Sequence, residues 1–222
     1  MSTYERKEMK IDLHVHIHRT ANCSKEEPEA MAKAAVERGI QGIVILDHNY
    51  QATKEECKRT ESLVHGIRVF RGIEVNVADE DVVIISNEDT HNFGLKYKEK
   101  IADIKKLADW VEATNSLAIL AHPYRRSDII SFDLNVFKPH AVEFAGRHVA
   151  VQNRPKIIQL AKQYRMNLIS VSDAHKGGQL GGFCIETMYA VNNEEDLIRD
   201  ICGGMYQLLE MKLVPVEFSW DV

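Results

Sequence analysis

Lys10-Ile11-Asp12-Leu13-His14-Val15-His16 reads as a β-strand that ends in two histidines. Successive side chains of a strand point to opposite faces, so His14 and His16 lie on the same face. Two imidazoles placed in this way can form the first half of a metal site. A lone pair is also typical of ordinary histidines at a strand end, so its meaning depends on what the rest of the chain brings beside it.

Strand-like and helix-like segments alternate along the rest of the chain. Short apolar runs indicate strands, and helical spacing with start and stop residues indicates helices. The run at 82–85 is expected to pair with the strand before it. The expected strands are 42–47, 67–75, 82–85, 117–121, 141–144, 167–173, 188–191 and 214–218, and the expected helices are 28–38, 51–64, 98–114, 154–164 and 194–203.

This alternation predicts an α/β fold in which helices cover parallel strands. Six or seven such units favour a closed or nearly closed β/α barrel over an open doubly wound sheet. The polar residues support the barrel, because the carboxyl ends of barrel strands converge on one face, which carries the active site. These residues, each at or near the end of a strand, are His16, Asp47, Glu74, His122, Glu143 and Asp173.

Composition narrows the class of protein. The 222 residues carry a net charge of −5, and 45% of them are hydrophobic, which is enough for one sizeable core. The whole chain, 1–222, is expected to form a single domain. The charge does not suggest a surface built mainly for nucleic acid. The four cysteines include no C-x-x-C pair, and no apolar stretch reaches the roughly 20 residues of a membrane helix, so a cytoplasmic protein is expected.

The polar groups after the strands have the chemistry of metal ligands. They are too many for a four-ligand structural zinc site, and imidazole mixed with carboxylate suits zinc, manganese or iron. Their number suits two or three closely spaced ions, with a carboxylate such as Glu74 bridging. Closely spaced metals activate water and stabilise the attacking and leaving oxygens in a displacement at phosphorus. The groups are His14-Val15-His16, Asp47-His48-Asn49, Gly72-Ile73-Glu74, Ala121-His122-Pro123 and Ser172-Asp173-Ala174-His175.

This ordered set resembles the PHP (polymerase and histidinol phosphatase) family of metal-dependent phosphoesterases. The resemblance implies a distorted seven-stranded (β/α)7 TIM-like barrel. It also implies that His14, His16, Glu74 and Asp173 hold one metal. Glu74 then bridges to a second metal that also takes His122, while His48 and His175 serve a third. Asp47 and Glu143 match groups that orient histidines.

Two departures from the family pattern leave the metal count at two or three. Residues 17–22 contain no carboxylate where many members carry Ser-Asp-Gly, although His18 and Asn22 are candidate substitutes. The strand at 82–85 lacks a histidine that members often carry. Asp81 borders that strand, and His91 lies further along the chain.

The sequence therefore predicts a metal-dependent phosphoric ester hydrolase, either a phosphatase or a phosphodiesterase or nuclease. Asp173 and His175 are candidates for proton transfer, and Arg125 is a candidate for gripping a phosphate, with Arg126 as its neighbour. The expected substrate is a small phosphorylated molecule or a short oligonucleotide. Two alternatives remain, namely a non-catalytic regulatory PHP domain and a metal-dependent amidohydrolase. The substrate and the oligomeric state cannot be read from these residues.

Overall fold

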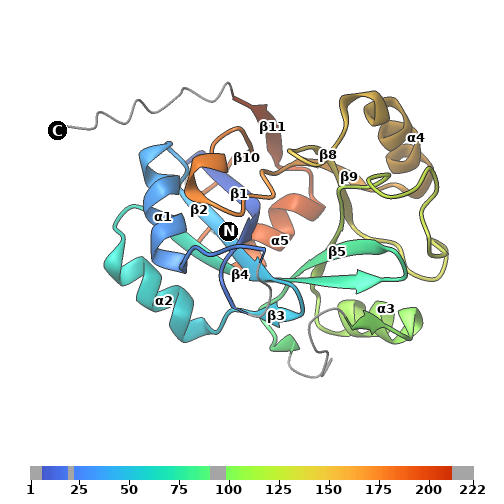
Figure 1. The fold of residues 1–222 in the computed structure, drawn as a ribbon, viewed down its shortest axis with the longest axis horizontal. Coiled ribbons are helices and arrows are strands. Elements are labelled where there is room, and N and C mark those ends of the chain that lie inside the picture. The colour runs from blue at the N-terminus through green and yellow to red at the C-terminus, as the bar shows by residue number, and fades with distance from the viewer. Residues whose placement is uncertain (1–6, 20–22, 91–98, 212–222) are drawn as a thin grey trace, which may run out of the picture.

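The protein is described by a computed structural model that places residues 7–19, 23–90 and 99–211. Its strands form one 11-stranded mixed sheet that curls into a distorted barrel, with helices packed on the outside (Figure 1). The β/α barrel predicted from the sequence is confirmed. Within the described ranges, no helix combines the length and the apolar character that crossing a membrane requires.

The strands follow the order β11-β10-β1-β2-β4-β5-β7-β8-β9 around the sheet, with β3 and β6 attached to β2 and β4. The pairs β1–β2, β2–β4, β7–β8 and β8–β9 are parallel. The strands are β1 (Met9–His16), β2 (Gly42–Asp47), β3 (Tyr50–Gln51), β4 (Arg68–Val77), β5 (Glu80–Ile85), β6 (Lys100–Ile101), β7 (Leu117–Ala121), β8 (Ala141–Ala145), β9 (Asn167–Ser170), β10 (Phe183–Thr187) and β11 (Tyr206–Glu210).

Several of the α-helices in the described ranges begin at residues that suit a helix N-terminus. Pro28 lies in the first turn of α1, where the missing N–H costs nothing. The side chain of Thr53 accepts a hydrogen bond from the N–H of Glu56, whose carboxylate accepts in return from the Thr53 N–H. This reciprocal cap starts α2 at Lys54, not at the predicted 51. The helices are α1 (Pro28–Glu37), α2 (Lys54–Leu63), α3 (Ile104–Ala113), α4 (Arg154–Tyr164) and α5 (Glu194–Cys202), with short 3-10 turns η2 (Val151–Asn153) and η3 (Gly177–Gln179).

The C-terminal third departs most from the prediction. The strand expected at 188–191 is wrong. The strand is β10, five residues earlier, because its alternating side chains let it pair antiparallel with both β1 and β11. The chain then turns, and the Thr187 hydroxyl donates to the carbonyl of Tyr189. β11 was not predicted, and the strand expected at 214–218 lies outside the described residues. The predicted helix at 98–114 begins only at Ile104, because Asp103 caps it.

The barrel closes through a few separate hydrogen bonds at the seam between β9 and β1. The hydroxyl of Ser170 donates to the Leu209 carbonyl at 2.7 Å, which ties β9 to β11. After the end of β9, the chain contacts β1 directly. There the His16 N–H donates to the Ala174 carbonyl at 2.8 Å. This direct contact brings the last residues of β1 beside the segment that carries Asp173 and His175.

Apolar side chains fill the part of the barrel interior that lies nearer to α5. Phe70 of β4, Val83 of β5, Ile119 of β7 and Ile169 of β9 belong to one buried cluster. Leu197 and Ile201 of α5 join the same cluster, so α5 covers the end where the parallel strands begin. We call this the amino end of the barrel, and the opposite end, where these strands finish, the carboxyl end.

Candidate metal centre

A bulge in β1 turns His14 and His16 into the barrel. Asp12 pairs with Ile43 and Val15 with Ile45, so β1 contains one extra residue between these pairs. Leu13, at the start of the irregular stretch, packs in the interior cluster, whereas Val15, after it, packs outside against α1. Without the bulge, strict alternation from Leu13 would send both histidines outward. Bulges often re-aim side chains in this way beside functional sites.

Acidic side chains continue the inward-facing rows of the apolar interior. Along β4, Phe70 is followed two steps later by Gly72 and then by Glu74. The same parity places Glu143 above Ala141 on β8 and Asp173 above Val171 after β9. β5 runs antiparallel, so its first residues reach the carboxyl end and carry Asp81 above Val83. The carboxyl end therefore has a buried layer of carboxylates.

These carboxylates and the histidines converge on common points. The Nε2 atoms of His14 and His16 lie 3.0 Å apart. The Oδ1 atom of Asp173 is 3.4 Å from the first and 3.3 Å from the second. The carboxylate of Glu74 reaches the same two nitrogens at 3.6 and 3.3 Å. Four donor groups thus surround one position, and they are the four residues that the family resemblance implies as ligands of one metal.

Glu74 also joins two neighbouring groups of donors. Its Oε1 lies 3.3 Å from His122 Nε2, and its Oε2 lies 3.0 Å from His48 Nδ1. His122 Nε2 in turn lies 3.7 Å from Asp81 Oδ2. Glu74, Asp81 and His122 offer ligand atoms within 4.8 Å of one another, as do His14, His16 and Glu74. Glu74 therefore lies between the two groups, the position that a bridging carboxylate would need.

The carboxylate oxygens at the centre lack ordinary hydrogen-bond partners. Both oxygens of Glu74 and the Oδ1 of Asp173 are buried, and none of the imidazole nitrogens 3.0–3.6 Å away makes a hydrogen bond of ordinary geometry with them. A buried carboxylate without a donor is costly unless a cation compensates it. Imidazole nitrogens and carboxylate oxygens without thiolate suit zinc, manganese or iron at this position. The residues present therefore fit a divalent metal ion.

Two further carboxylates hold the histidines and loops in place. Glu143 Oε1 lies 2.7 Å from His14 Nδ1, and its Oε2 accepts the N–H of His122 at 2.7 Å. Asp47 accepts the N–H groups of His48 at 2.7 Å and of Arg19 at 3.1 Å. Glu143 thus contacts an imidazole directly, whereas Asp47 fixes the backbone of two loops.

The electrostatics show how strongly the groups depend on one another. Burial alone would lower the pKa of His14, but Asp173, Glu143 and Glu74 raise it to about 9. Burial would raise the pKa of Glu74, but His122, His14 and His16 bring it well below its usual range. Burial is likewise outweighed at Asp173, where His14, His148 and His16 lower the pKa. Such a network attracts cations, and a bound metal would displace the imidazole protons.

Backbone strain is concentrated at the same end of the barrel. Asn49, His122 and Asp173 have positive φ angles of 56°, 27° and 50°. A non-glycine residue in this region costs about 1–3 kcal/mol, and such residues cluster at functional sites. The strain positions side chains that a relaxed strand end would direct elsewhere.

The structure places the remaining predicted residues at the edge of the centre. His175 stacks on His16 with ring centroids 4.1 Å apart, and its Nδ1 lies 3.6 Å from Asp173 Oδ1. Arg125 is exposed, while Arg126 pairs with Asp81 at 2.6 Å. His18 contacts the Ser24 carbonyl at 3.1 Å. Asn22 and His91 lie outside the described residues.

Three residues at the centre had no role in the sequence prediction. Asp81 is one ligand candidate, and His148 bonds Asp173 Oδ2 through its Nδ1. Cys23 lies beside His16 and Asp47. Asp81 lies two residues before the inward-facing Val83, so it shares the same face of β5. This spacing would have indicated Asp81 if β5 had been recognised as antiparallel. The loops that carry His148 and Cys23 have no periodicity, so no pattern pointed to them.

The sequence profile of the PHP domain matches residues 12–214. The chain is also similar to an uncharacterised protein of Methanocaldococcus jannaschii, with 32% identity over 126 residues, or 52% of this chain and 68% of that protein. The profile match covers every residue assigned to the centre, from His14 to His175.

Solved structures with the same fold are more distant in sequence. A two-domain protein of Bacteroides vulgatus, containing a predicted PHP-like metal-dependent phosphoesterase, has 14% identity and a TM-score of 0.71, covering 92% of this chain and 65% of that one. The lesion-specific endonuclease PfuEndoQ of Pyrococcus furiosus has 12% identity and a TM-score of 0.67, covering 91% and 58%. These similarities establish the fold.

Proposed function

The chain belongs to the PHP domain family, and from this premise we propose that it is a metal-dependent phosphoesterase. The observation that carries the proposal is the set of buried, unpartnered oxygens of Glu74 and Asp173, which face the imidazoles of His14, His16 and His122. This arrangement has too many charges and too few hydrogen bonds to serve the packing of the barrel alone. It is suited to binding cations.

We assign the ligands in two overlapping groups. The first comprises His14, His16, Glu74 and Asp173, and the second comprises Glu74, Asp81 and His122. A metal ion held here would activate water and neutralise charge on the phosphoryl oxygens. Glu143 would keep His14 in the required orientation through its contact with Nδ1.

His148 is better placed than His175 to move a proton. Its Nδ1 is bonded to Asp173, and its side chain is 30% exposed, so it is within reach of a bound substrate. A carboxylate on one ring nitrogen sets the tautomer and leaves the other nitrogen for acid–base work. We propose that His148, protonated on both ring nitrogens, gives the proton of Nε2 to the leaving oxygen and keeps the Nδ1 proton on its contact with Asp173. Arg125, exposed and three residues after His122 in the chain, would contact the phosphate, while Arg126 is held by Asp81.

Hydrolysis of a generic aryl phosphate ester by the manganese- or zinc-loaded protein tests the proposal. The double variant His14→Ala plus Glu74→Ala should lose both bound metal and turnover. His140→Asn, at the amino end of the barrel, is the matched control. Unchanged turnover in the double variant would refute the mechanism.

A substrate panel separates the alternatives. Phosphate monoesters, diesters, short oligonucleotides, cyclic amides and deaminase substrates should be compared at equal metal content. The proposal expects turnover among the phosphate esters. Turnover of the amides alone would favour an amidohydrolase, and bound metal without turnover of any compound would favour a regulatory domain.

A further inference from the structure

Cys23 lies among imidazoles at the carboxyl end of the barrel. Its Sγ is 3.6 Å from His16 Nδ1 and 3.7 Å from Asp47 Oδ1. Cys23, His16 and His175 offer ligand atoms within 4.8 Å of one another. The His16 ring also lies 5.0 Å from the His48 ring, measured between centroids. The thiol is thus part of a cluster of donors.

The chain around Cys23 is tied to the opposite side of the cluster. The hydroxyl of the next residue, Ser24, donates to the carbonyl of His175 at 3.0 Å and accepts the N–H of Glu26 at 3.2 Å. Ser24 is 1% exposed, so this contact is a packed part of the fold. Cys23 is therefore held beside His175 by a contact between residues distant in sequence.

The donors at the centre divide into three groups. His14, His16, Glu74 and Asp173 surround one point, and Glu74, Asp81 and His122 surround a second. His48 and His175 remain outside both groups. His16 faces the first group with Nε2 and Cys23 with Nδ1, so its second nitrogen can donate to the sulfur.

We propose that Cys23 supplies a thiolate ligand to a third cation, held together with His48 and His175. This inference rests on the proposed metal centre and names a ligand of it that lies just beyond the carboxylate-free segment 17–22. His16 would donate from Nδ1 to the same sulfur. The thiol gives up its proton when the metal binds.

The surroundings and the chemistry of the sulfur both suit this role. His16 Nδ1 lies 3.6 Å from Cys23 Sγ and can donate to a thiolate. A thiolate is a soft ligand that favours zinc, iron or cobalt over magnesium and manganese. The third position should therefore select different metals from the first two, whose carboxylates accept harder ions.

Reconstitution of the full chain with cobalt(II) tests the proposal without reference to activity. A thiolate bound to cobalt gives a charge-transfer band in the near ultraviolet, which imidazole and carboxylate ligands do not give. We expect this band in the wild-type protein, with three cobalt ions per chain. Cys23→Ser should lose the band and one cobalt ion, and Cys23→Asp should lose the band but retain the third ion.

Cys202→Ser is the matched control, because Cys202 is also exposed but lies on α5 at the amino end. It should keep both the band and the third ion. A band that persists in Cys23→Ser, or a wild-type protein that binds cobalt without the band, would overturn the inference while leaving the metal centre intact. Absence of all cobalt binding would refute the metal centre and the inference together. A wild-type protein that shows the band but hydrolyses no phosphate ester would refute only the phosphoesterase proposal.

Discussion

The two ends of the barrel each hold a histidine beside a strand, and the two imidazoles respond to their surroundings in opposite ways. His122, at the carboxyl end, is 3% exposed, and although burial lowers its pKa, Glu74, Glu143 and Asp173 raise it. His140, at the amino end, accepts the Ala118 N–H through Nδ1 at 3.1 Å. Burial lowers its pKa, and Lys138 lowers it further.

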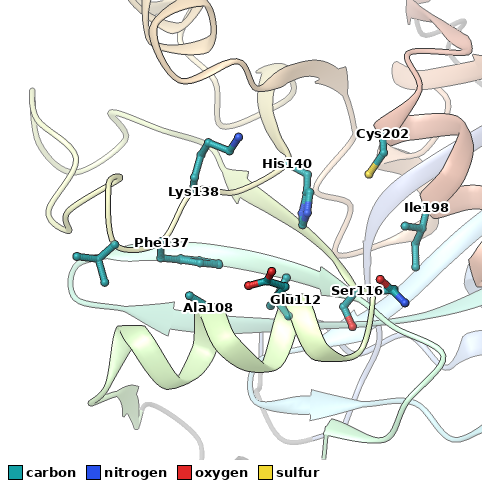
Figure 2. A pocket seen from close by; sticks show the side chains of 11 residues that line it. Ala108, Glu112, Ser116, Phe137, Lys138, His140, Ile198 and Cys202 are labelled. Atoms are coloured by element: carbon teal, nitrogen blue, oxygen red, sulfur yellow. The ribbon is translucent and has the colours of Figure 1, made fainter.

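Two cavities near the amino end also differ from the carboxyl end in the charged groups around them. A cavity of about 590 Å³ lies at the amino end, between α3 and α5. Figure 2 shows its lining, which includes Glu112, Ser116, His140 and Cys202. Another, of about 600 Å³, lies near the first residues of β1 and β4. Neither cavity contains the converging carboxylates found at the carboxyl end. The cavity that holds His140 therefore lacks the feature that defines the candidate metal centre, namely buried carboxylates that face the imidazoles.

The largest expected effect comes from removing the central charge. Glu74→Gln leaves the shape of the side chain but removes the anion that His14, His16, His48 and His122 face. Loss of a group that only orients a ligand typically weakens metal affinity about 10–100-fold, so loss of the bridging ligand should exceed about 100-fold. Metal analysis and competition with a chelator measure the change. Glu112→Gln, in the opposite cavity, should leave metal affinity unchanged, and equal effects of both variants would remove the distinction between the ends.

The next effect concerns the orienting carboxylate. Glu143→Ala removes both the contact with His14 Nδ1 and the acceptor for the His122 N–H. Metal affinity should fall about 10–100-fold, because the ligands remain but lose their fixed orientation. Metal affinity should fall less in Glu143→Gln, because this variant retains one acceptor oxygen. Chelator competition on the three proteins tests this ranking, and an Ala variant that binds metal as tightly as wild type would contradict it.

The sequence predicted most of the carboxyl end because its residues follow apolar runs. His14, Glu74, His122 and Asp173 each complete a strand pattern that is visible locally. Asp81 was missed because the alternation of strands and helices suggests parallel neighbours, whereas β5 runs antiparallel and presents its first residues to the site. Cys23 was missed because a hydrogen bond from Ser24 to His175 holds its loop, and such long-range contacts leave no local pattern. The strand expected at 188–191 failed for a related reason, since pairing with β1 and β11 selects 183–187.

A third prediction concerns the apolar interior beneath the metal centre. A Cβ atom on Gly72 would lie 2.7 Å from Val44 Cγ1, whereas a Cβ on Gly178 would meet nothing within 4 Å. Gly72→Ala should lower the free energy of unfolding by about 1–3 kcal/mol, as overpacking in a filled core does. Urea denaturation of both variants measures the difference. If Gly178→Ala destabilises the protein as much, packing below Glu74 is not the cause.

A fourth prediction tests the protonation of the two ends directly. In chelator-treated protein, the imidazole of His14 should titrate with a pKa of about 9, because Asp173, Glu143 and Glu74 outweigh its burial. His140 should titrate below the usual pKa of about 6.5. Imidazole proton resonances followed against pH give both values. Two histidines that titrate together would contradict the electrostatic difference between the ends.

The smallest effect is expected from His140→Asn, whose amide oxygen can accept the Ala118 N–H in place of Nδ1. The pKa of His140 is lower in the folded protein than in the unfolded chain, so below pH 6.5 the unfolded chain binds more protons. This side chain therefore lowers stability as the pH falls. The variant should exceed wild type in thermal stability at pH 5.5 and match it at pH 7.5, with metal affinity unchanged at both. A variant that is less stable at low pH would mean that the protonated imidazole finds a partner in the folded protein, and the amino end would then resemble the carboxyl end.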